Sequence, residues 1–138
     1  NMMTAMMTEE GFNKEEAIRN MYLTNRHLRD LVNNNHLLGL HSYEHYTNIG
    51  TLDFDVQSSE YRQNFEHLKD VTGHDIKVMS HPSSSYNNDT KTILEKLGIT
   101  LGFRDNMLLD NGMENINASK FEIAREDHAN IIKMMRKS

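Results

Sequence analysis

The chain contains 138 residues, of which 37% are hydrophobic and 25% are charged, and its formal net charge is −5. This size and composition suit a single globular domain with a sizeable core, and the acidic balance argues against nucleic-acid binding. Cysteine is absent, which excludes disulfides and thiolate metal sites, and no apolar run is long enough to predict a membrane-spanning helix.

The beginning of the chain predicts two short helices. Residues 1–12 carry four of the ten methionines with little periodicity, so we expect them to be loosely ordered or to pack irregularly. Asn13 is a good cap for a helix that begins near Lys14, and Thr24 or Asn25 is expected to cap the next one.

An apolar run follows an asparagine-rich stretch and ends at two histidines. Residues 37–40 predict a buried strand that ends at His41, and His45 follows at a spacing of four. If the chain turns helically after the strand, the two imidazoles lie on one side of the turn and can share a divalent metal. The carboxyl end of a parallel strand is where α/β sheets and barrels place their chemistry. A chance pair remains the alternative, because the chain has eight histidines.

Beyond the histidines, helical and extended patterns alternate. Apolar residues at spacings of four and three predict a helix around Tyr61, and Gly73 is its expected left-handed stop. Residues 76–79 predict a second strand. Asn88 or Asp89 is expected to cap the helix that follows it.

The same alternation continues to the C-terminus. Gly98 should end a helix, residues 99–103 and 121–123 predict two more strands, and Asp127 or His128 should open a last helix. Strands that alternate with helices predict an α/β fold with a parallel sheet and right-handed crossovers. The strand interiors and apolar helix faces give the expected buried residues: Leu38, Leu40, Phe65, Leu68, Val78, Ile93, Leu97, Ile99 and Leu101.

Three segments of this sequence resemble one family. Gly39-Leu40-His41-Ser42-Tyr43-Glu44-His45 is similar to the G-x-H-[ST]-x-x-H signature of the polysaccharide deacetylase (NodB-homology) family of carbohydrate esterases. The segment Ser80–Thr90 resembles the proline-containing groove segment of that family, and Phe121–Arg125 resembles its late strand ending in Pro-Arg. The segments occur in the family's order, and the resemblance extends from about Thr24 to the C-terminus.

The resemblance implies both a fold and a reaction. The fold would be a partial or distorted (β/α) barrel with parallel strands, and the reaction would be metal-dependent deacetylation of an N-acetylated or O-acetylated polysaccharide, a hydrolysis of non-peptide C–N bonds in the N-acetyl case. His41 and His45 would hold a divalent metal, usually zinc, the backbone N–H of Ser83 would stabilise the oxyanion, and Arg125 would orient a carboxylate. A location in the cell envelope or outside the cell would fit the family. The expected substrate-binding residues are His81, Pro82, Ser84 and Tyr86.

This sequence departs from the family pattern in ways that bear on catalysis. The first motif of the family, T-F-D-D, supplies the catalytic base and the third metal ligand, and it does not occur before His41. Asp53 and Asp55 come after the histidines, so they are not its equivalent. We therefore expect residues 1–138 to be one truncated domain that lacks the opening strands and the base. Its exposed sheet edges would permit self-association.

Several alternatives stay open at the level of sequence. Ser80 replaces the usual arginine of the groove segment, and this favours a non-catalytic carbohydrate-binding or assembly module on the same scaffold. Glu44 lies between the histidines and is a candidate substitute ligand. Arg125 could instead pair with Glu122 or a neighbouring acid. An unrelated metal-binding α/β domain is a third possibility.

Overall fold

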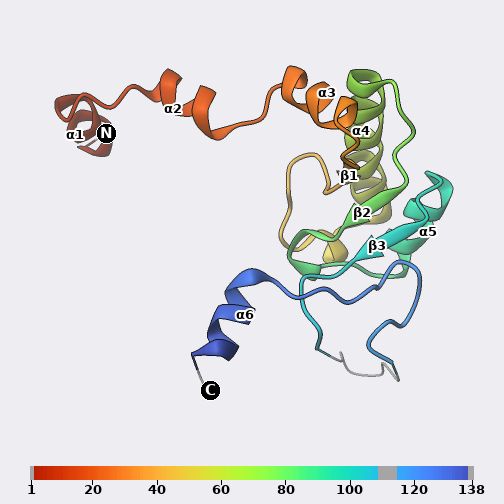
Figure 1. Ribbon diagram of the computed structural model, residues 1–138. Helices are drawn as coiled ribbons and strands as arrows, with labels where there is room; N and C mark the ends of the chain where they lie inside the picture. Colours follow the sequence, from red (N-terminus) through yellow and green to blue (C-terminus); the bar gives the residue numbers. More distant parts are fainter. Residues whose placement is uncertain (1, 109–114, 137–138) are drawn as a thin grey trace.

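A three-stranded parallel sheet forms the centre of the chain. The computed structural model describes residues 2–108 and 115–136, and Figure 1 shows the sheet at the middle of its main body. The strands are β1 (Gly39–Leu40), β2 (Val78–Ser80) and β3 (Leu101–Phe103), in the spatial order β1-β2-β3. A parallel bridge joins Phe103 to Ile123. The predicted fourth strand is therefore present only as this single bridge beside β3.

Helices connect the strands and cover one face of the sheet. β1 leads through η1 (Ile49–Thr51) into α4 (Phe54–Thr72), and β2 leads through η2 (Pro82–Ser84) into α5 (Asn88–Lys96). Because the strands lie in chain order and crossovers between parallel strands are right-handed, both helices fall on the same face. α4 packs against α5, β1 and the preceding α3 (Asn25–Asn33). The result is a β/α layer pair, which confirms the predicted α/β class.

The sheet buries only one of its faces within the described residues. The register pairs Leu40 with Met79 and Met79 with Gly102, and all three residues are buried. The alternate positions, including Val78 and Leu101, point to the opposite face. Leu101 is 39% exposed and Val78 is half-buried, so the prediction that Leu101 belongs to the core is wrong. Two-sided burial would need a second layer over this face.

The core lies between the sheet and the helix layer. Four of the expected residues are buried there, and Leu38, Phe65 and Leu97 pack against them while partly exposed. The core also contains residues that the strand and helix patterns did not single out, such as Ile49 at 0% exposure and Phe121 at 4%. The buried hydrophobic residues are Leu40, Ile49, Tyr61, Leu68, Ile76, Met79, Ile93, Leu94, Ile99 and Phe121.

Local signals placed most helix ends correctly. The side chains of Asn13 and Thr24 cap the following helices, and Gly73 adopts the left-handed conformation at φ 71°. The cap of α5 is Asn87 and not Asn88 or Asp89. Asn87 and Thr90 form a reciprocal capping box, which satisfies two amides at once.

The first two helices extend away from the body (Figure 1). They are α1 (Met2–Glu9) and α2 (Lys14–Met21), and exposed residues such as Met3 and Met21 project from them. Residues 2–9, which we expected to be loosely ordered or to pack irregularly, form a regular helix instead, in keeping with the high helix propensity of Met and Ala. α6 (His128–Met135) also stands apart from the sheet, and Asp127 caps it through a 2.8 Å hydrogen bond from Ala129 N–H.

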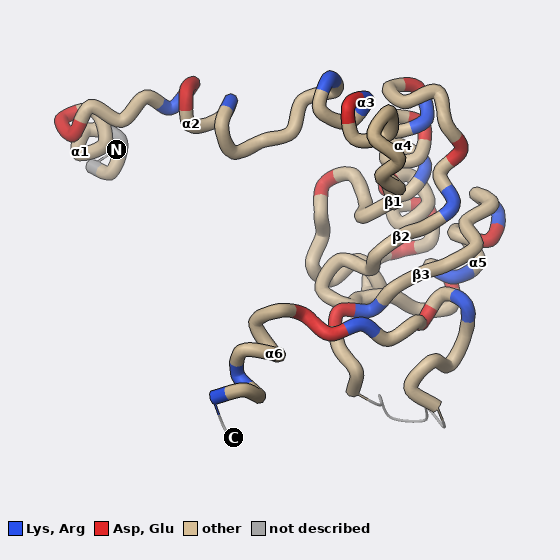
Figure 2. The backbone as a smooth tube through the Cα atoms, viewed as in Figure 1, with Lys and Arg blue, Asp and Glu red and all other residues tan. Residues whose placement is uncertain are grey.

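Charged residues are dispersed over the chain. Figure 2 shows acidic and basic positions interspersed along the tube, without a long run of one sign. None of the helices in the described ranges is both long and apolar enough to cross a membrane.

Candidate functional site

The two histidines of the opening motif meet at the carboxyl end of β1. The ring centroids of His41 and His45 are 4.8 Å apart, and the ring planes are tilted by 60°. The backbone between them, which we call the histidine loop (residues 41–45), is not helical, so the predicted helical turn is wrong. Ser42 and His45 adopt left-handed conformations at φ 62° and 58° instead. These two positions turn the chain back and bring the rings together.

A hydrogen bond orients one ring of this pair. His41 Nδ1 lies 2.8 Å from the backbone oxygen of Ser80, at the end of β2. A carbonyl oxygen only accepts hydrogen bonds, so Nδ1 carries the proton and Nε2 keeps its lone pair. Metal-binding histidines commonly donate their second ring N–H in this way. Since both rings are exposed, His41 and His45 fit the role of two ligands for a divalent cation.

Helix α4 supplies residues of this site that the sequence analysis missed. The buried carboxylate of Glu60 accepts the N–H groups of Tyr43 and Glu44, and Asn64 Oδ1 accepts the N–H of His41. Glu60 and Asn64 are four residues apart and share a helix face. The sequence indicated only that these two polar residues lie four apart beside the apolar stripe of a predicted helix. It did not indicate that they contact the histidine loop.

The groove segment forms a tight turn after β2. Ser83 and Ser84 both have φ 50°, an unfavourable conformation for residues other than glycine. The N–H groups of Ser84 and Ser85 are bonded to His81 O and Pro82 O within the turn. The N–H of Ser83 makes no hydrogen bond to any other described residue, and Ser83 is exposed. Ser83 N–H is therefore free to donate to a ligand.

The remaining predicted groove residues lie behind this turn. His81 is 1% exposed and Pro82 is buried, so neither presents a side chain to a ligand. His81 Nε2 donates to Phe121 O at 2.7 Å, and its ring stacks on Tyr86 with centroids 4.3 Å apart. Burial lowers the pKa of His81 to about 4, which keeps the ring neutral at neutral pH. Burial of both side chains therefore argues against the predicted substrate-binding role of His81 and Pro82, and they pack behind the turn instead.

Ser84 and Tyr86 are each half-buried. Ser84 Oγ donates to Asp105 Oδ1 and accepts the Asp105 N–H at 2.8 Å, which ties the turn to the chain that follows β3. The backbone of Tyr86 lies against Gly50 of η1, where a Cβ would meet it at 2.7 Å. Gly50 N–H also donates to Ser85 Oγ. Thus η1, which follows the histidine loop, packs directly on the groove segment.

Arg125 reaches the same edge of the sheet. Its Nε donates to Arg104 O at 3.1 Å, and its Nη2 donates to Ser80 Oγ at 2.9 Å. Ser80 therefore contacts His41 through its carbonyl and Arg125 through its hydroxyl. Glu122, an alternative partner of Arg125, is paired with Lys91 at 3.4 Å. Burial raises the pKa of Glu122, but the bond from Ser119 and the Lys91 charge outweigh burial and hold that pKa below its ordinary value.

A third metal ligand is not at hand in the described part of the chain. No group of three His, Asp or Glu residues is arranged there to hold a metal ion. Glu44 therefore does not complete a site with the two histidines. Asp53 occupies the N-cap position of α4 and Asp55 lies in its first turn, and neither joins the pair.

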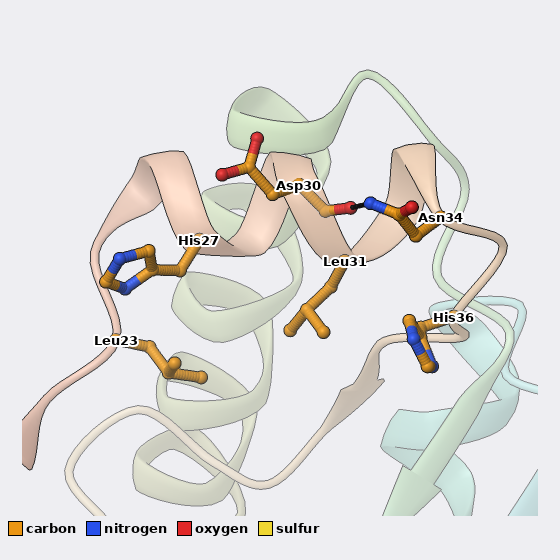
Figure 3. Close-up of a pocket in the computed structure, with 6 residues that line it drawn as sticks. All are labelled: Leu23, His27, Asp30, Leu31, Asn34 and His36. Carbon is orange, nitrogen blue, oxygen red and sulfur yellow. Dashed lines mark hydrogen bonds between the residues drawn. The ribbon is translucent and has the colours of Figure 1, made fainter.

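A separate hollow lies along α3 (Figure 3). It has a volume of about 390 Å³, and neither His41 nor His45 lines it. His27 and His36 stand at opposite ends of it in Figure 3, and His27 Nδ1 is occupied by the N–H of Thr24 at 3.2 Å. The hollow has no convergent set of ligands, so the histidine loop remains the candidate site. Its lining residues are Leu23, His27, Asp30, Leu31, Asn34 and His36.

The family can be assigned from a match over most of the chain. The family model described as Polysaccharide deacetylase matches residues 4–102. The chain belongs to the polysaccharide deacetylase family. The matched range includes β1, the histidine loop, β2 and the groove segment of this deacetylase-family domain, whereas Arg125 lies beyond it.

Solved structures with a similar fold agree with this assignment. The Streptococcus pyogenes deacetylase PplD, solved with acetate, has a TM-score of 0.65 at 18% identity, with 82% of this chain and 50% of that one covered. The deacetylase domain of BpsB from Bordetella bronchiseptica has a TM-score of 0.59 at 15% identity and coverages of 76% and 48%. A CE4 family pseudoenzyme from Bacillus anthracis has a TM-score of 0.52 at 23% identity and coverages of 54% and 26%.

This chain thus spans about a quarter to half of the length of these structures. The fold of this chain corresponds to the part of the (β/α) barrel that it covers in these structures. No curated protein matches the chain significantly.

Proposed function

We propose that this domain carries the metal-binding half of an enzyme that removes acetyl groups from an N-acetylated or O-acetylated polysaccharide. The observation that supports it most is the ring pair at 4.8 Å, in which the Nδ1–H of His41 is committed to Ser80 O and leaves Nε2 for a ligand. A divalent metal, zinc by preference, would polarise the acetyl carbonyl and acidify a water molecule when bound there.

Each residue around the pair has a chemical role in this proposal. His41 and His45 hold the metal, and the unpaired N–H of Ser83 donates to the oxygen that becomes negative when the acetyl carbonyl is attacked. Arg125 holds its guanidinium at Ser80, where it can orient a carboxylate. The left-handed serines of the groove segment favour a functional reading, because strained backbone clusters at sites where it fixes a reacting geometry.

The proposed activity needs two groups that the described residues do not supply at this site. Catalytic zinc usually has three protein ligands and one open position, whereas the proposal supplies only His41 and His45, and no group of three possible ligands occurs among the described residues. A positioned base would accept the proton of the attacking water, and such a base typically contributes about 10²–10⁴-fold in rate. We therefore predict that the 138-residue chain alone does not release acetate, whereas a longer chain that carries an upstream pair of aspartates does.

Acetate release from an N-acetylated oligosaccharide, with zinc or cobalt added, tests this prediction. The chain is compared with a version extended upstream and with its own Asp53→Asn and Asp55→Asn variants. Metal-dependent turnover by the short chain that disappears in either variant would place the base after the histidines. It would contradict the proposal that the base lies outside this chain.

Metal binding is tested separately from activity. Isothermal titration with zinc should show measurable binding to the wild type, strong weakening in His41→Ala, and no change in His74→Ala, an exposed histidine that follows α4. Equal affinities of the wild type and His41→Ala would remove the metal site and with it the proposed reaction.

A second candidate function is a non-catalytic carbohydrate-binding or assembly module. The lack of a third ligand among the described residues favours it. Binding of an acetylated oligosaccharide by the extended chain, without acetate release at any metal concentration, would select this candidate.

Self-association is a further proposal about partners. β1 is an end strand of the three-stranded sheet, and an unpaired strand edge is a template for another chain. Light scattering over a range of concentrations should show dimers, and a mass that stays monomeric at the highest concentration would reject the proposal.

A further inference from the structure

Side chains, and not a helix or a sheet, hold the backbone of the histidine loop. The N–H of His41 donates to Asn64 Oδ1 at 2.9 Å. The N–H groups of Tyr43 and Glu44 both donate to one oxygen, Glu60 Oε2, at 3.0 and 2.8 Å. Three backbone groups of the loop thus depend on two residues of a helix that is far away in sequence.

Glu60 is well suited to fix this loop. It lies in the interior of α4, a helix of 19 residues, and is only 6% exposed. Hydrogen bonds to a carboxylate are about twice as strong as neutral ones. Because Glu60 is buried, little water can compete for its carboxylate oxygens. The carboxylate is therefore a stationary anchor for the loop.

The loop needs such an anchor because its backbone is strained. Ser42 and His45 are left-handed without being glycine, and such residues persist only where the surrounding structure holds them. The two N–H groups that Glu60 accepts belong to the residues between them. Releasing these N–H groups would let the loop relax toward common backbone conformations and change the separation of the rings.

We propose that Glu60 is a positioning residue that sets the separation of the His41 and His45 rings through the N–H groups of Tyr43 and Glu44. It does not contact the metal. The inference rests on the proposed function in one respect, because the geometry it protects is that of the proposed metal site.

The first test uses the metal-free protein, so that it does not depend on zinc binding. With histidine-selective isotope labelling, the wild type should give an NOE between the His41 and His45 rings and the signature of an Nδ1-protonated His41. Glu60→Ala should lose the ring-to-ring NOE, whereas Glu66→Ala, which changes an exposed glutamate of the same helix, should keep it. An unchanged NOE in a folded Glu60→Ala protein would overturn the inference.

The second test measures zinc affinity by competition with a chromophoric chelator. Loss of a residue that orients a metal ligand typically weakens binding by about 10–100-fold, and we expect this range for Glu60→Ala. Glu60→Gln keeps an acceptor oxygen without the charge, so the expected order of affinity is wild type, Gln, Ala. If the alanine variant does not fold, a glutamine variant equal to the wild type in both readouts overturns the inference.

The two proposals fail in different ways. A wild type that binds no zinc, but whose ring-to-ring NOE still depends on Glu60, refutes the metal site and leaves the positioning role standing. A wild type that binds zinc with the same affinity as Glu60→Ala refutes the positioning role and leaves the metal site standing.

Discussion

One buried histidine should make this domain less stable at mildly acidic pH than at neutral pH. His81 is 1% exposed, whereas the other seven histidines are exposed. Burial lowers its pKa from 6.5 to about 4 in the fold. Between these values the unfolded chain binds a proton at this position that the folded chain does not. Acid therefore favours the unfolded state.

The size of the effect follows from the two pKa values. Above about pH 7, the ionisation of His81 leaves the free energy of unfolding unchanged. This free energy decreases as pH falls below 6.5, and the decrease is complete below pH 4. From pH 8 to pH 5 the loss is about 2 kcal/mol, and the full loss is about 3 kcal/mol. The depressed pKa of Glu122 adds a loss of the same sign, but only at lower pH.

Urea unfolding at several pH values between 8 and 5, with a chelator present, measures this dependence. His81→Gln places a neutral side-chain N–H where it can donate to Phe121 O, so the variant should lose less stability than the wild type over this range by about 2 kcal/mol. His74→Gln, an exposed control, should follow the wild type. Parallel pH profiles for the wild type and His81→Gln would refute the reasoning.

Two predictions concern packing, and urea unfolding checks both. Leu40→Ala should cost roughly 2–5 kcal/mol because Leu40 is 1% exposed, whereas Leu37→Ala, at a residue 86% exposed, should change stability by less than about 0.5 kcal/mol; equal costs would show that the face of β1 is misassigned. Gly50→Ala should cost about 1–3 kcal/mol because its Cβ would lie 2.7 Å from the Tyr86 backbone. No cost would mean that η1 does not pack on the groove segment.

Local chemistry explains which parts of the fold could be predicted from the sequence. Caps and stops depend on a few neighbouring residues, and so the cap at Thr24 and the left-handed Gly73 were predictable. The burial of Leu101 was not, because a strand pattern does not say whether the second face of a sheet is covered. The fourth strand reduces to the bridge at Ile123 for a similar reason, since pairing depends on a distant neighbour.

The candidate site, like the fold, was predictable from the sequence only where it depends on neighbouring residues. The spacing of His41 and His45 indicated that they act together, and the structure brings them together. It does so by a loop that no helical pattern describes, since the contacts that shape it come from Glu60 and Asn64 of α4. The role of His81 could not be read from its place beside a proline, because its burial depends on Phe121, forty residues later.

The register of the sheet connects the fold to the site. Leu40 pairs with Met79, so His41, the first residue after β1, lies beside Ser80, the last residue of β2, and the ring of His41 can reach the Ser80 carbonyl. A slip of one residue in β1 would turn Leu40 out of the core and move His41 away from that carbonyl. The burial that fixes the strand therefore also fixes which nitrogen of His41 bonds to Ser80 and which nitrogen would be left for the proposed metal.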